Sequence, residues 1–135
     1  MIKTKIIIDA SGGVLGRIAS FAAKQSLFGK EIVIVNCNEA LITGRGENTL
    51  SRYTRAKKRG GSGLKGPRIL KSPERIMKRT VRGMLSHKQL RGREAFRRIM
   101  CYNLVPDEFV SVEKISLVRP IKMRAIKLQK LSEVL

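Results

Sequence analysis

Two short apolar runs on either side of a helical pattern, near the start of the chain, constrain its fold more than any other feature. Residues 6–8 are all isoleucine and are followed by Asp9 and a glycine turn, and residues 32–35 form a second run of isoleucine and valine. Short, continuous β-branched runs are typical of strands buried on both faces of a parallel sheet. Residues 14–29 carry apolar side chains at helical spacing, and Gly29 is a suitable stop. The order strand, helix, strand predicts a βαβ unit with a right-handed crossover.

The second constraint is a large positive charge concentrated in one part of the chain. The 135 residues include 29 Lys and Arg against 10 Asp and Glu, which gives a net charge of +19. Residues 48–104 contain seventeen basic and two acidic residues, so this segment alone carries +15. Folding gives no reason to tolerate so much self-repulsion, and we therefore expect a polyanionic partner. With 42% hydrophobic residues, the chain is nonetheless too apolar to be wholly disordered.

The length and the charge distribution predict one domain, residues 1–135, in three parts. Residues 1–47 form the βαβ core, and residues 48–104 form helices and a loop that bind the partner. Residues 105–135 complete the domain with a strand, indicated by alternating apolar residues over 110–118, and a short terminal helix over 128–135.

The basic segment is expected to form a helix over 48–59, a loop over 60–71, and helices over 73–85 and 90–102. The loop contains four glycines and a proline among basic residues, so it cannot bury a large side chain. In the last helix we expect Phe96, Ile99 and Met100 to face inward and Arg91, Arg97 and Arg98 to face outward.

The helix over 73–85 has the clearest signals. Ser72 is a suitable N-cap, Pro73 is tolerated in the first turn, and Glu74 suits the positive end of the helix dipole. At helical spacing, one side of this helix is apolar and the opposite side is basic. The residues expected to face inward are Met77, Val81, Met84 and Leu85, and those expected to face outward are Arg75, Arg79 and Arg82. Met84→Asp is therefore expected to unfold this region by burying a charge.

An enzyme that binds a nucleotide at the glycine turn is the main alternative function. Residues 11–16, Ser-Gly-Gly-Val-Leu-Gly, follow a strand and begin a helix, as a dinucleotide-binding turn does. However, Ser11 replaces the first glycine of that motif, and Asn36 to Asn38 stand where an acidic residue would contact the ribose. The only histidine, His87, has no acidic neighbour, and Cys37 and Cys101 are too far apart in sequence for a typical metal motif. We therefore expect a structural turn, buried thiols, and neither catalysis nor a metal site.

The chemistry of the basic segment favours structured RNA as the polyanion. Lys and Arg bind a nucleic-acid backbone by displacing counterions. With two Tyr, four Phe and no Trp, the chain has few rings on which single-stranded bases could stack, so contacts to phosphates and 2′-hydroxyls fit better. A DNA-packaging or regulatory protein would share this charge and remains a second alternative. A membrane-binding amphipathic protein is disfavoured by the strand-rich core, and no apolar run reaches the length of a membrane span or of a secretory signal.

Several segments resemble the thirteenth large-subunit ribosomal protein family. Residues 15–20, Leu-Gly-Arg-Ile-Ala-Ser, follow the first strand, and residues 34–36 and 42–44 also match. The most specific segments are residues 72–76, Ser-Pro-Glu-Arg-Ile, and 80–85, Thr-Val-Arg-Gly-Met-Leu, with Arg-Gly-Arg following at 91–93. Gly-Pro-Arg at 66–68 and His-Lys at 87–88 look like the archaeal and eukaryotic branch. Ser86 departs from the proline that is usual in the family, and residues 102–104 lack a glycine that commonly follows the tyrosine.

The resemblance implies an α/β protein, with a three-layer α/β/α arrangement around a small parallel sheet and basic helical and loop extensions. It implies a non-enzymatic structural constituent of the cytoplasmic large ribosomal subunit that binds large-subunit ribosomal RNA, contacts neighbouring ribosomal proteins, and supports assembly and translation. No cofactor, metal, membrane or small-molecule substrate is expected. By charge and motif match, the expected RNA contacts are Arg52, Arg55, Lys57, Lys58, Arg59, Lys65, Arg68, Lys71, Arg75, Arg79, Arg82, Lys88, Arg91, Arg93 and Arg97.

Overall fold

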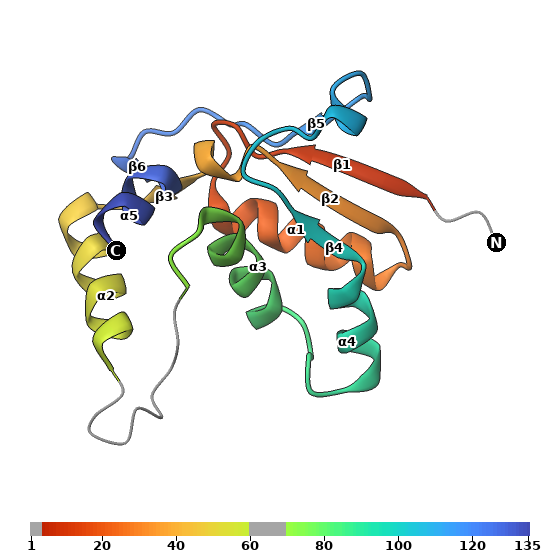
Figure 1. Ribbon diagram of the computed structural model, residues 1–135, viewed down its shortest axis with the longest axis horizontal. Helices are drawn as coiled ribbons and strands as arrows, with labels where there is room; N and C mark the ends of the chain where they lie inside the picture. Colours follow the sequence, from red (N-terminus) through yellow and green to blue (C-terminus); the bar gives the residue numbers. More distant parts are fainter. Residues whose placement is uncertain (1–3, 60–69) are drawn as a thin grey trace.

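A computed structural model describes residues 4–59 and 70–135. Its main sheet contains four parallel strands in the order β4-β2-β1-β5 (Figure 1). The strands are β1 (Lys5–Asp9), β2 (Glu31–Val35), β4 (Ile99–Cys101) and β5 (Ile115–Ser116). A second, two-stranded antiparallel sheet joins β3 (Leu41–Thr43) to β6 (Ala125–Lys127). The expected α/β class and the parallel sheet are confirmed.

The predicted βαβ unit is present as β1, α1 (Leu15–Leu27) and β2. Helix α1 forms because its apolar residues share one side, where Leu15, Ile18 and Ala22 are buried. The helix stops where Gly29 takes a φ of +89°, a conformation that side chains disfavour. The prediction of these three elements came within two residues of their observed ends.

Alternating side chains of the strands divide the core into two parts. Ile8, Ile32 and Ile34 face the helices and are completely buried with residues of α1, α3 (Pro73–Gly83), α4 (Leu90–Arg97) and α5 (Leu128–Val134). Burial of each isoleucine side chain contributes about 1.5–3 kcal/mol. Ile7 and Val33 face the other way, where the 3-10 turn η2 (Asp107–Phe109) brings Phe109 against them.

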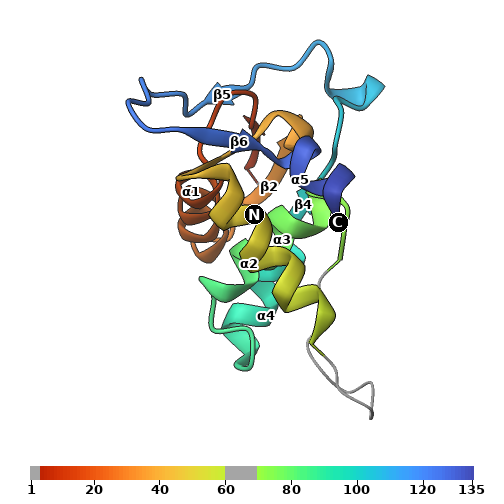
Figure 2. The same cartoon turned by 90° about the vertical axis from the view of Figure 1, so that its left-hand side faces the viewer.

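Figure 1 shows the resulting layers: α1, α3 and α4 cover one face of the main sheet, and the chain around η2 crosses the other face. The layer on this second face is therefore a segment with one 3-10 turn rather than an α-helix. Helix α2 (Gly46–Lys58) lies at one end of the molecule, near the small sheet and α5 (Figure 2). The expected loop over 60–71 falls mostly outside the described residues.

The segment after α4 corrects one prediction. The helix expected over 90–102 ends at Arg97, and Ile99–Cys101 forms β4, which pairs with the free edge of β2. Pairing gives β2 a second hydrogen-bonded neighbour and buries Ile99 completely, which local helical spacing could not reveal. Met100, expected to face inward, is 45% exposed because adjacent strand residues point to opposite faces.

Two further predictions were wrong at the ends of elements. Helix α3 ends at Gly83, so Met84 leaves the helical phase and is 45% exposed, whereas Met77, Val81 and Leu85 are buried as expected. Over 110–118, only Ile115–Ser116 pairs as a strand, and Val110 is exposed because it belongs to the turn after η2. The expected terminal helix is present as α5.

Candidate nucleic-acid interface

Helix α2 presents cations outward because its few apolar residues face the body of the protein. Thr49 is buried, and Leu50 and Tyr53 pack partly buried against the main core. The exposed residues on the other sides include Arg52 and Arg55. At the end of the helix, the exposed Lys57 donates from Nζ to the carbonyl oxygen of Leu135, at 2.9 Å.

Helix α3 separates its two faces as predicted. Ile76, Met77 and Val81 are buried, and Arg75, Arg79 and Arg82 are exposed. The sequence also predicted that Ser72 caps this helix with its side chain, but Ser72 makes no such hydrogen bond.

The first turn of α3 is capped from a distant part of the chain. The backbone N–H of Glu74 donates to Oδ1 of Asn103, at 3.0 Å. Asn103 follows β4, so the end of the sheet supplies the capping oxygen. This bond joins residues 29 positions apart, and a local sequence signal cannot reveal it.

Helix α4 is short, and its buried residues are small. Gly92 and Ala95 are buried, while Arg91, Arg93 and Arg97 are exposed. Arg98 was expected to face outward with them. It is half-buried, and its guanidinium donates to the carbonyl oxygen of Ser26 at the end of α1, at 2.9 Å.

All the expected RNA-contacting cations that lie within the described residues are exposed, and we call them the basic face. They come from α2, α3, α4 and the chain that adjoins these helices. Lys65 and Arg68 lie outside the described residues. The basic face comprises Arg52, Arg55, Lys57, Lys58, Arg59, Lys71, Arg75, Arg79, Arg82, Lys88, Arg91, Arg93 and Arg97.

A groove of about 480 Å³ lies within the basic face, between α2, α3 and α4. Its lining combines cations of α3 with apolar side chains from all three helices and from Leu70, just before α3. Lys78, which the sequence placed at the border between the two faces of α3, is half-buried, and its Nζ lies 5.0 Å from the centre of the Phe96 ring. Helix α2 contributes Tyr53 to this groove, and burial raises the pKa of Tyr53. Helical spacing did not identify the groove, because three separate helices form it.

A second group of cations, which the sequence does not predict, lies near the start of α2. Arg45, Arg124 and Lys130 line a depression together with Lys127. Antiparallel pairing of β3 with β6 brings these residues together, and the N–H of Gly44 donates to the carbonyl oxygen of Arg124, at 2.7 Å. Charge counts along the chain could not find this group, because its members are distant in sequence.

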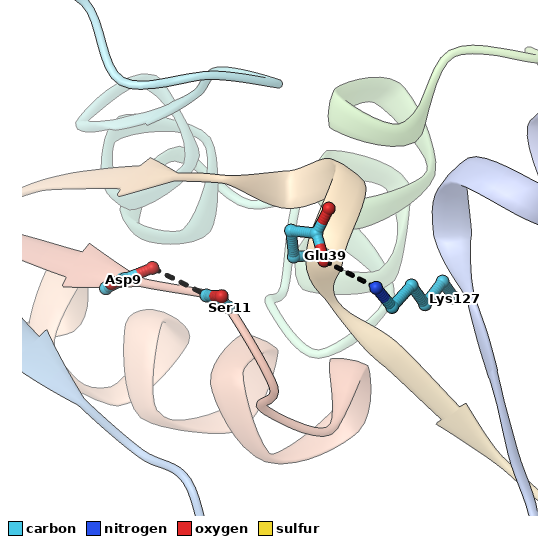
Figure 3. A network of polar contacts seen from close by, with 4 residues as sticks. All are labelled: Asp9, Ser11, Glu39 and Lys127. Atoms are coloured by element: carbon cyan, nitrogen blue, oxygen red, sulfur yellow. Dashed lines mark hydrogen bonds and ion pairs between the residues drawn. The ribbon is translucent and has the colours of Figure 1, made fainter.

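The glycine turn after β1 is used for internal contacts. The carboxylate of Asp9 accepts from the N–H of Ser11, at 3.0 Å (Figure 3). It also accepts from the side-chain amide of Asn36, at 3.0 Å. The N–H groups of Gly12 and Gly13 donate to carbonyl oxygens of Glu39 and Ala10. The N–H groups of residues 11–13 therefore already have acceptors within the protein, which argues against a phosphate bound by the turn itself.

Glu39 links this region to the small sheet. Its carboxylate pairs with Nζ of Lys127 in β6, at 2.8 Å, as Figure 3 also shows. Both side chains are largely exposed, so the ion pair contributes at most about 1 kcal/mol.

The two cysteines and the histidine do not form a common site. Cys37 is buried, Cys101 is half-buried, and both thiols are free. A hydrogen bond with Cys101 and burial raise the pKa of Cys37, which keeps this thiol protonated and unreactive. The backbone N–H of His87 donates to the carbonyl oxygen of Leu85. Within residues 4–59 and 70–135, no cluster of His, Cys, Asp and Glu could hold a metal ion.

Sequence comparison assigns the family. The family model for "Ribosomal protein L13" matches residues 3–107. The chain belongs to the ribosomal protein L13 family. This is a family of ribosomal proteins and not of enzymes. The match spans β1 to β4 and helices α1 to α4, so it includes the whole basic face and leaves β5, β6 and α5 outside.

Archaeal relatives of this family extend the similarity over most of the chain. All three described here are named "Large ribosomal subunit protein uL13". The relative from Methanosarcina barkeri is 46% identical over 82% of this chain and 79% of its own length. The one from Archaeoglobus fulgidus is 50% identical over 76% of this chain and 65% of its own length. The one from Natronomonas pharaonis is 40% identical over 95% and 88%, respectively. The expected archaeal-like character is confirmed.

Among the described residues, no helix is both long and apolar enough to cross a membrane.

Proposed function

We propose that this protein is a structural constituent of the large ribosomal subunit that binds and organises large-subunit ribosomal RNA through its basic face. In this role it supports subunit assembly and translation, with neighbouring ribosomal proteins as further partners. The names of its archaeal relatives support the location in the large subunit.

The observation that carries the proposal is the division of α3 into a buried apolar side and an exposed basic side. Arg75 and Arg82 take no part in the core, so their charges are available to a partner. The neighbouring helices expose cations in the same way. Binding of a polyanion to such a surface releases counterions and relieves the repulsion of a net charge of +19.

Structured RNA is the polyanion that best fits this surface. Phosphates and 2′-hydroxyls present regularly spaced acceptors to arginine side chains. The described cations of the basic face come from three helices and the chain that adjoins them rather than from one element, which suits the shape of a folded RNA better than that of an extended strand.

A binding experiment with two matched variants tests the proposal. Arg79→Glu combined with Arg82→Glu is expected to weaken binding to transcribed large-subunit ribosomal RNA at least 10-fold, because it places negative charge on the basic face. Arg119→Glu combined with Lys122→Glu changes the net charge equally on the chain between β5 and β6 and is expected to have a smaller effect. Both variants should keep the helical circular dichroism of the unaltered protein, since all four side chains are exposed.

Equal weakening by both variants would show that net charge alone determines affinity and would contradict the role of the basic face. Equally tight binding of duplex DNA in competition would favour a DNA-binding protein instead.

In a cell lysate sedimented through sucrose with magnesium, the protein should migrate with the large subunit after a high-salt wash. Migration at the top of the gradient would overturn the proposal.

A further inference from the structure

The groove between α2, α3 and α4 has an apolar part and a cationic part. Its apolar part includes Tyr53, Leu70 and Phe96, and its cations include Arg75 and Arg82. No described residue that lines the groove is acidic. Its volume of about 480 Å³ lies in the range of about 300–1,000 Å³ that is common for small-ligand sites. The groove can therefore receive a flat apolar group attached to an anion.

The aromatic side chains are placed to contact such a group. Tyr53 and Phe96 are only partly buried, so part of each ring remains accessible. The ammonium group of Lys78 lies over the Phe96 ring, so positive charge is held next to the apolar part of the groove. Helical spacing places Arg75, Arg79 and Arg82 along one side of α3.

An unpaired nucleotide supplies both parts of this ligand, whereas a base-paired nucleotide supplies only one. In an RNA helix the faces of the bases are stacked, so a protein reaches only the backbone and the base edges in the minor groove. A bulged base is free to stack on an aromatic ring or a guanidinium group while its phosphates contact cations.

We infer that this groove binds one unpaired nucleotide of a structured RNA, with the base against Tyr53, Leu70 and Phe96 and the flanking phosphates on the arginines of α3. The inference rests on the proposed RNA-binding function and adds to it a specific structural feature of the RNA. The basic face gives general affinity for RNA, and the groove selects a site that carries an unpaired base.

Two RNA probes test the inference: a fully paired stem, and the same stem with a single unpaired adenosine. The unaltered full-length protein is expected to bind the bulged stem about 10-fold more tightly, as the stacking of one base provides. With 2-aminopurine at the unpaired position, binding should also quench its fluorescence, because the base stacks on a ring.

Three variants assign the preference to the groove. Tyr53→Leu removes the ring but keeps an apolar side chain, and it should bring the two stems to nearly equal affinity. Tyr53→Phe keeps the ring and should keep the preference. Gly83→Leu extends a side chain from a position where a Cβ meets nothing within 4 Å, so it should fill the groove and abolish the preference without disturbing the core. All three should bind the paired stem like the unaltered protein.

Binding of the two stems distinguishes a failure of the groove to hold an unpaired base from a failure of the protein to bind RNA. Equal binding of both stems by the unaltered protein would overturn the inference and leave RNA binding intact. A preference that survives in both Tyr53→Leu and Gly83→Leu would also overturn it. Displacement of the bulged stem by a polyglutamate peptide, without displacement of the paired stem, would assign the groove to an acidic protein segment. Binding of neither stem would overturn the proposed function and the inference together.

Discussion

Gly92 packs against the chain just before α4 so closely that no side chain fits there. A Cβ at this position would overlap the carbonyl group of Ser86. The carbonyl carbon and oxygen of Ser86 belong to the backbone, so rotating a side chain cannot relieve the overlap. Gly92→Ala is expected to destabilise the protein by about 1–3 kcal/mol, measured as a lower midpoint of urea unfolding. Gly83→Ala, at an open position, should leave the midpoint unchanged or slightly raised.

Substitution of Met77 or Met84 with aspartate is expected to change the stability of the protein by very different amounts. Met77 is completely buried, so Met77→Asp should cost more than about 3 kcal/mol and unfold the region. Met84 is 45% exposed after the end of the helix, so Met84→Asp should change stability by less than about 1 kcal/mol. Thermal melts of both variants, followed by circular dichroism, give the comparison. Similar losses in both would contradict the observed end of α3.

At the scale of elements, the cap of α3 can be tested directly. Asn103→Ala removes the acceptor of the Glu74 N–H and should cost about 1 kcal/mol. Ser72→Ala removes a side chain that makes no capping bond and should cost much less. Urea unfolding of both variants decides between the two residues. A larger loss for Ser72→Ala would support the local cap that the sequence suggests.

The same element shows what sequence patterns can and cannot predict. The apolar and basic sides of α3 follow from helical spacing alone, and β1, α1 and β2 follow from apolar runs between clear breakers. Strand β4 was mistaken for helix because its identity depends on the free edge of β2, which is distant in sequence. The groove and the cations of Arg45, Arg124 and Lys130 were missed for the same reason. Exposure of the basic face was predictable, since few charged side chains are ever buried.

At the scale of the whole molecule, the net charge of +19 opposes compactness. Added salt screens charges that lie more than about 10 Å apart at 0.1 M ionic strength. The melting temperature of the isolated protein is therefore expected to rise as potassium chloride increases from low to moderate concentration. Substituting Arg52, Arg55 and Arg79 with glutamine should reduce this salt dependence. A melting temperature that falls with salt would show that attractive ion pairs outweigh the repulsion.

The capping of α3 by Asn103 has a consequence during synthesis of the chain. The residues of α3 are synthesised before residue 103. Strand β4 can pair with β2 only when residues 99–101 have also been synthesised. A nascent chain that stops before this point therefore has the arginines of α3 but not the acceptor that fixes its first turn. Helix α3 is therefore completed only when the residues that close this edge of the sheet are available, so we expect its first turn to become fixed as the core folds.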